Sequence, residues 1–167
     1  MSKKIITLAI AALALTAPIA TIAQNPFNNG MPGIAIAGTT GADNLPQEAK
    51  NFIHKHFKDV AIRAVEKEFD ENTYEVNMAN GVEMEFSGAG QILSIDAPDY
   101  GKSLPIRVVK DILPHKAYEE LKKIRQEANV DEIEFKGGHI YEIGTREIHA
   151  NDYSFDITRN IWTVDPD

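Results

Sequence analysis

Residues Tyr74–Phe86 read YEVNMANGVEMEF, and this stretch decides the fold. Apolar and polar residues alternate on both sides of Asn80-Gly81, which is the pattern of two half-buried strands. Asn-Gly between two such runs is a strong signal for a two-residue β-hairpin turn, with positive φ expected at both residues. The stretch therefore predicts an antiparallel hairpin that buries its apolar face and exposes Glu75, Glu83 and Glu85 on the other.

One helix and two further strands complete the unit around this hairpin. Leu45-Pro46 opens a segment in which apolar residues and His56 recur every three or four positions through Phe57, as on the buried face of a helix. Val60–Phe69 and Gln91–Ala97 predict the flanking strands. The alternation within Val60–Phe69 is irregular, so the sequence does not assign its two faces.

The same pattern then restarts, because Leu104-Pro105 repeats Leu45-Pro46 at an offset of 59 residues. Two short helices are expected, separated by Pro114, and the second extends to Ala128. Four strands follow, over residues 130–135, 140–143, 152–157 and 161–164. Such a recurrence indicates duplication of one supersecondary unit.

The predicted fold class is α+β, a tandem repeat of a helix plus a four-stranded antiparallel sheet. The helices cover one face of the sheet and the other face stays open. Each unit has only about 60 residues and would be marginally stable alone. We therefore expect the two units to share one sheet or to pack tightly.

These motifs resemble the PepSY-like, β-lactamase-inhibitor-like (BLIP-like) secreted proteins of Bacteroidetes-type bacteria. The resemblance covers roughly residues 45 to 165 and rests on Leu45-Pro46, Tyr74-Glu75-Val76, Asn80-Gly81, Glu83-Met84-Glu85-Phe86, Gly90 and Leu104-Pro105. It implies a tandem α+β architecture whose open sheet face grips a protein, as in the β-lactamase inhibitors. It also implies likeness to the inhibitory propeptide modules of secreted peptidases, and it supplies no catalytic residues.

The N-terminal segment has the layout of a secretory signal peptide. Lys3 and Lys4 precede the uncharged run Ile5–Ala17, Pro18 breaks any helix, and Thr21-Ile22-Ala23 offers small residues for cleavage after Ala23. The alternative is an uncleaved membrane anchor. The expected organisation is a signal peptide over 1–23, a flexible linker over 24–44, a first PepSY-like repeat over 45–100 and a second over 101–167. The expected location is the periplasm or the cell exterior.

Composition and charge exclude several classes of protein. The chain of 167 residues has 17 Lys and Arg against 25 Asp and Glu, and no cysteine. Cleavage after Ala23 would remove two lysines and no acid, which leaves a net charge of −10. An acidic balance argues against nucleic acid as a partner. The absence of cysteine excludes disulfides, thiolate zinc sites and a thiol nucleophile.

The candidate site is the open face of the sheet, which the alternation makes acidic. Its predicted protein-binding residues are Glu75, Glu83, Glu85, Glu142, Asp152 and Asp156, and Glu132 and Glu134 are expected on the same face. One interpretation is a docking surface for a basic protein, peptide or cation. The other is a solvated face whose charges discourage aggregation.

No catalytic or metal-binding motif stands out in the sequence. The serines lie outside G-x-S-x-G and S-x-x-K motifs, and no calcium-loop motif is present. His54 and His56 are two residues apart and so do not share a helix face. The sequence therefore predicts an exported, non-enzymatic binding module without a cofactor, with inhibition of a secreted or periplasmic enzyme as one form of its function. The alternative is an envelope sensor or a small-ligand or cation-binding protein of the same fold.

Overall fold

The computed structural model describes residues 41–98, 101–146 and 151–166. The predicted signal peptide and most of the predicted linker lie outside these ranges. The last linker residues, Ala42–Asn44, form a short 3₁₀ helix, η1.

The first repeat is one helix followed by four strands, as the sequence predicts. Its elements are α1 (Gln47–Phe57), β1 (Ile62–Glu68), β2 (Thr73–Met78), β3 (Glu83–Ser87) and β4 (Ile92–Asp96). Helix α1 begins directly after Pro46. Proline is tolerated at the start of a helix, because the N–H that it lacks would have no intrahelical acceptor there. Its buried residues are Ala49, Ile53, His56 and Phe57, so the expected helix face is confirmed.

The second repeat has two helices before its four strands. Its elements are α2 (Ile106–Ile112), α3 (His115–Lys123), β5 (Val130–Lys136), β6 (Ile140–Thr145), β7 (Asn151–Asp156) and β8 (Ile161–Pro166). Pro114 separates the two helices, as expected. The predicted extension of the second helix to Ala128 is wrong. Arg125 adopts a left-handed φ of 60°, and the amide of Gln126 donates to the Leu121 carbonyl, which closes the helix end.

The hairpin at Asn80-Gly81 forms, but the expected turn geometry is wrong. Only Gly81 has positive φ, at 89°, and its amide donates to the Met78 carbonyl. The Asn80 side chain accepts a hydrogen bond from the Val82 amide. The connection is therefore longer than a two-residue turn, with glycine at its one left-handed position.

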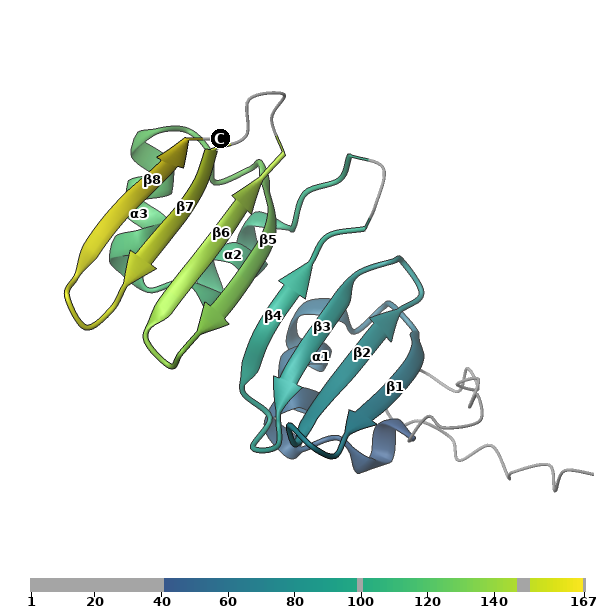
Figure 1. Cartoon of the computed structure of the whole chain (residues 1–167). Helices are drawn as coiled ribbons and strands as arrows, with labels where there is room; N and C mark the ends of the chain where they lie inside the picture. Colours follow the sequence, from purple (N-terminus) through teal and green to yellow (C-terminus); the bar gives the residue numbers. More distant parts are fainter. Residues whose placement is uncertain (1–40, 99–100, 147–150, 167) are drawn as a thin grey trace, which may run out of the picture.

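All eight strands form a single antiparallel sheet in the order β1 to β8. Each strand pairs with the next along the chain, and the two repeats join where β4 pairs with β5 through three residue pairs. The helices lie on one face of this sheet and leave the other face open (Figure 1). The predicted fold class is confirmed, and the two repeats share one sheet.

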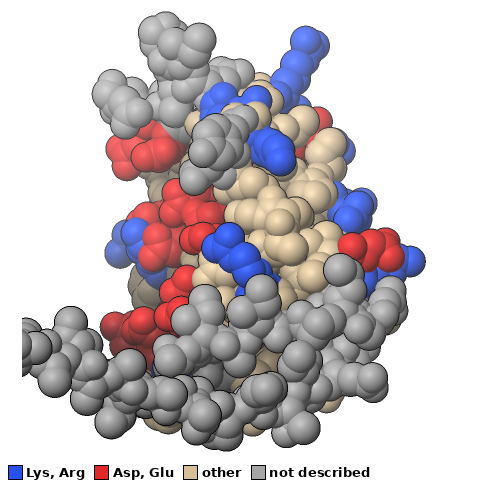
Figure 2. Space-filling model, turned by 90° about the vertical axis from the view of Figure 1, so that its right-hand side faces the viewer, with Lys and Arg blue, Asp and Glu red and all other residues tan. Residues whose placement is uncertain are grey.

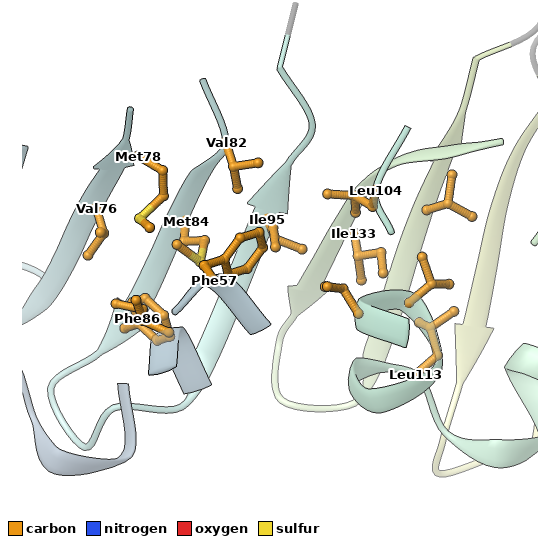
Figure 3. Close-up of a cluster of buried hydrophobic side chains, with 14 of the residues drawn as sticks. Phe57, Val76, Met78, Val82, Met84, Phe86, Ile95, Leu104, Leu113 and Ile133 are labelled. Carbon is orange, nitrogen blue, oxygen red and sulfur yellow. The ribbon is translucent and has the colours of Figure 1, made fainter. Parts of the chain in front are cut away.

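The hydrophobic core lies between the helices and the sheet and continues across the junction of the repeats (Figure 3). Ile95 of β4 and Ile133 of β5 are Cα partners, and both side chains are buried. Phe57 and Met84 lie on one side of this pair, and Leu104 and Leu113 lie on the other. The buried residues of both repeats therefore form one continuous core.

Polar contacts between helices reinforce the junction. The Lys55 ammonium donates to both carboxylate oxygens of Asp111, at 2.6 and 2.8 Å. The Arg107 guanidinium donates to the His56 carbonyl at 2.8 Å. Helices α1 and α2 are thereby tied together on the covered face of the sheet.

Candidate functional site

The strand registers align the carboxylates of the open face into a row that crosses the whole sheet. Successive Cα partners along this row, which we call the acidic row, are Glu66, Glu75, Glu85, Ser94, Glu134, Glu142, Ser154 and Thr163. Five of its eight members are glutamates and none is basic. Because side chains alternate between the faces of a strand, this row points away from the helices.

A second row lies beside the first and concentrates charge at the centre of the sheet. Its successive Cα partners are Ala64, Asn77, Glu83, Asp96, Glu132 and Gly144. Glu83, Asp96 and Glu132 are therefore neighbours on β3, β4 and β5, and they bridge the junction of the repeats. Like charges directly opposite one another on adjacent strands are unfavourable. The sheet tolerates this cost where the two repeats meet.

Buried residues that alternate with the acidic residues along the same strands confirm which way the acidic side chains point. Val76, Met84, Ile133 and Ile143 face the helices and are at most 2% exposed. The acidic residues between them consequently face the other way. When the molecule is viewed from the right of Figure 1, acidic side chains gather over the open face, and Lys and Arg lie mostly toward the helix side (Figure 2).

Five of the six predicted site residues lie together on this face. Glu75, Glu85 and Glu142 belong to the acidic row, Glu83 belongs to the second row, and Asp152 is the Cα partner of Asp165 near the far end of the sheet.

Asp156 also lies on the open face, but it is engaged in a turn. Its Oδ1 accepts hydrogen bonds from the amides of Thr158 and Arg159, at 2.8 and 2.9 Å. These amides, that of Arg159 first, hold the pKa of Asp156 below its ordinary value. The carboxylate is therefore occupied in shaping the β7–β8 connection.

Several acidic residues of the face were missed by sequence reasoning, among them Asp96, Glu66 and Asp165, the Cα partner of Asp152. Asp96 follows the buried Ile95 by one residue, so the alternation in β4 carried enough signal to place it outward. Glu66 could not be placed in this way, because β1 contains a register shift between Ile62 and Ala64. Only its pairing with Glu75 assigns Glu66 to the acidic row.

Lys136 is the one cation that forms ion pairs with the glutamates of the acidic row in the described part of the chain. Its ammonium lies 2.6 Å from Glu142 Oε2 and 3.0 Å from Glu134 Oε2. These hydrogen bonds, that with Glu142 first, raise the pKa of Lys136. The neutralisation is local to β5 and β6, and Glu75 and Glu85 on the first repeat form no such ion pair with any described residue.

The carboxylates at the junction are perturbed because they are partly desolvated and crowded. Burial, followed by the charges of Glu132 and Glu83, raises the pKa of Asp96 to about 6. Burial also raises the pKa of Asp131 and of Glu132. Each shift disfavours the ionised form. The centre of the face thus holds negative charge that a cationic partner would relieve.

Shallow hollows follow the two rows. One of about 450 Å³ lies at the end of the junction and is lined by acidic residues and by Lys102 and Arg146. Another of about 310 Å³ lies over the first repeat, lined by Glu75, Glu83, Glu85 and Asp96 among others. Hollows this open suit a protein surface better than an enclosed small molecule.

The histidines in the described part of the chain do not assemble a metal centre. His56 is buried on α1, and its Nε2 lies 2.7 Å from Asp111 Oδ2. Among residues 41–98, 101–146 and 151–166, no three or more His, Asp or Glu side chains are placed to hold a metal ion. Within the same ranges, no helix is long and apolar enough to span a membrane.

The first repeat is similar to a known protein family. Residues 38–94 match the family described as "Putative beta-lactamase-inhibitor-like, PepSY-like". These residues are a PepSY-like domain. A search of curated proteins found no match.

Solved structures share the fold over both repeats. A "putative calcium-regulated periplasmic protein" from Bacteroides thetaiotaomicron is 25% identical, with a TM-score of 0.59 over 76% of this chain and 94% of that one. A "putative periplasmic protein of unknown function" from Bacteroides vulgatus is 24% identical, with a TM-score of 0.58 over 75% and 95%. A further "putative periplasmic protein" from B. vulgatus is 22% identical, with a TM-score of 0.57 over 75% and 91%. Three quarters of this chain exceeds one repeat, so the likeness to these structures includes the tandem arrangement.

Proposed function

We propose that this protein is an exported, non-enzymatic binding module whose acidic sheet face docks a basic surface of another protein. The observation that carries the proposal is the acidic row, which presents five glutamates across the sheet beside Glu83, Asp96 and Glu132. Such a field attracts a basic partner and orients the encounter. Inhibition of a secreted or periplasmic enzyme is one form that this binding takes.

Two comparisons support the proposal. The matching family carries the description β-lactamase-inhibitor-like, and the similar solved structures are described as periplasmic proteins. A periplasmic or secreted location also agrees with the signal-peptide pattern that ends at Ala23. No helix of the described residues lies on the open face, which leaves it accessible to a protein partner (Figure 1).

The competing interpretation is that these charges only keep the face solvated. The test places a photo-crosslinking residue at Glu85 on the open face and, as a control, at Glu119 on α3 of the covered face. Docking predicts that Glu85, and not Glu119, crosslinks one defined protein in the native envelope. Equal capture from both positions, or capture from neither, would contradict it.

The purified partner then allows a matched charge test. The variant Glu75→Gln, Glu85→Gln removes two charges from the acidic row, and Glu119→Gln, Glu120→Gln removes two from α3. We expect the first variant to slow association and weaken its salt dependence, and the second to leave both unchanged. Direct assay against a purified β-lactamase tests the inhibitory form separately.

A second proposal is that a divalent cation binds at the junction of the repeats. Glu83, Asp96 and Glu132 are successive Cα partners on β3, β4 and β5, and a cation would offset the crowding of their charges. Binding would require these side chains to converge, because no three carboxylates of the described residues are placed to hold a metal ion as they stand. One similar structure is described as calcium-regulated. Calcium should then raise the melting temperature of the wild type and not of Asp96→Asn, whereas an unchanged melting temperature in the wild type would exclude the proposal.

A further inference from the structure

The two edges of the sheet differ in how well they are protected from pairing with another strand. At one edge, β1 exposes Arg63, Glu66 and Glu68 and contains a register shift. Charged side chains and bulges of this kind keep an edge strand from pairing. The other edge, β8, has neither device over most of its length.

Strand β8 presents an apolar edge. Its residues 161–166 are Ile, Trp, Thr, Val, Asp and Pro, so the one charge and the proline both lie at its end. Val164 is the Cα partner of Tyr153 on the helix side, yet it remains 46% exposed. Trp162, on the same side, stacks on Tyr153 with ring centroids 5.4 Å apart. An uncovered strand of this kind is a template for a further strand.

We propose that β8 pairs antiparallel with β8 of a second copy of this chain, about a two-fold axis through Thr163. Directly opposed residues of an antiparallel pair point to the same face. This axis therefore sets Trp162 against Val164 of the second copy on the helix side, twice by symmetry. On the open side it sets Ile161 against Asp165. An axis one residue away would lose both Trp–Val pairs.

The charge pattern favours a second copy as the occupant. The acidic row ends in Ser154 and Thr163, so the two acidic faces would meet at uncharged residues. Antiparallel pairing also brings Asp165 of one copy to the end of β8 that follows Arg159 in the other. The Arg159 side chain is 77% exposed in the turn before Ile161, and its Nε lies 3.7 Å from Asp156 Oδ2. Its guanidinium has further N–H groups that can compensate the Asp165 carboxylate of the second copy. The sheet has one other edge, β1, and that edge exposes charged side chains.

The proposed dimer joins two sheets into one and places two acidic faces side by side. The contact is a single strand pair with two Trp–Val contacts, which is small for a permanent interface. We therefore expect a reversible, concentration-dependent dimer. It does not depend on the function proposed for the acidic face.

Cysteine crosslinking tests the axis directly, because the chain has no cysteine of its own. Opposed Cα atoms on an antiparallel pair lie about 4.5–5.5 Å apart, which suits a disulfide. We expect Thr163→Cys to form a covalent dimer under mild oxidation. Ile161→Cys is the matched control on the same strand, since its two copies would lie roughly 14 Å apart. Equal crosslinking of both variants, or none of Thr163→Cys, would overturn the axis.

Sedimentation velocity of the full-length mature protein tests the dimer itself. The wild type should shift from monomer to dimer between micromolar and near-millimolar protein. Val164→Lys should remain monomeric, while Ala64→Lys at the β1 edge should dimerise like the wild type. Circular dichroism confirms that both variants are folded. A wild type that stays monomeric throughout, or a Val164→Lys variant that dimerises normally, refutes the proposal.

Discussion

The imidazole of His56 on α1 lies 2.7 Å, through Nε2, from Oδ2 of Asp111 on α2 and so joins the first repeat to the second. The imidazole is buried, and its other nitrogen, Nδ1, has no hydrogen-bond partner. The Asp111 carboxylate is therefore the hydrogen-bond partner of Nε2, the one ring nitrogen of His56 that has a partner. The contact is polar, buried on one side and placed at the junction, where no covalent link other than the chain connects the repeats.

Removing this carboxylate should destabilise the whole chain. We expect Asp111→Ala to lower the free energy of unfolding by about 1–3 kcal/mol, because it leaves the buried His56 ring without a partner. The partner of Lys55 is lost as well, but that ammonium is exposed and contributes little. Urea denaturation of Asp111→Ala and of Lys55→Ala measures the two effects. A smaller effect of Asp111→Ala than of Lys55→Ala would contradict this assignment.

Asp96 should make the protein less stable as the pH rises. Its folded-state pKa of about 6 lies above the ordinary value of 3.8, so between these values the folded state binds more protons than the unfolded state. The free energy of unfolding should therefore fall as the pH rises through this window. Asp96→Asn should remove part of the decline and raise stability at neutral pH by about 1 kcal/mol, after discounting for solvent screening. Chemical denaturation from pH 4 to pH 8 checks the sign, and a wild type that gains stability across the window would contradict it.

The two repeats should unfold as one unit. Ile95 and Ile133 face each other across the only strand pairing between the described parts of the repeats. We expect Ile95→Ala to cost about 2–5 kcal/mol and to lower the melting temperature of both repeats together. Differential scanning calorimetry should show one transition for the wild type and for the variant. Two separate transitions in the wild type would show that the repeats fold independently.

Gly90 should be intolerant of any side chain. Its φ is +87°, and a Cβ there would lie 2.9 Å from the Ala49 amide nitrogen and from Pro46 Cβ. Gly90→Ala should therefore push α1 away from the sheet and cost several kcal/mol, more than the roughly 1 kcal/mol of a left-handed alanine alone. Gly138 is the matched control, since its φ is +74° but the space around it is open. Comparable losses for Gly90→Ala and Gly138→Ala in thermal denaturation would contradict a steric role.

Most of the fold could be predicted because its signals are local. Strand alternation within Tyr74–Phe86 assigns two faces without knowledge of any neighbour, and Leu-Pro at two helix starts reveals the repeat. The prediction of the helix end failed where the local apolar pattern competes with the path that the chain must take in the tertiary structure. Ile124 and Ala128 continue the apolar spacing of α3, yet the helix ends at Lys123, because the chain must turn to bring Val130 into β5.

Part of the candidate site could also be predicted from local signals. Glu75, Glu83 and Glu85 follow from the hairpin alone, whereas Glu66 required its pairing partner, because a bulge in β1 shifts the alternation. Asp156 was placed on the correct face, but its engagement with the amides of the next turn depends on backbone geometry that residue spacing does not contain.

The sequence by itself determined the duplicated helix-and-strand unit and the face on which Glu75, Glu83 and Glu85 lie, because both follow from periodicities within one segment. Only the tertiary structure decided that β4 pairs with β5, that Glu83, Asp96 and Glu132 become neighbours, and that the acidic row runs unbroken from one repeat to the other. The register between two strands is set by side chains from both and by the packing of the helices above them. No single segment carries that information.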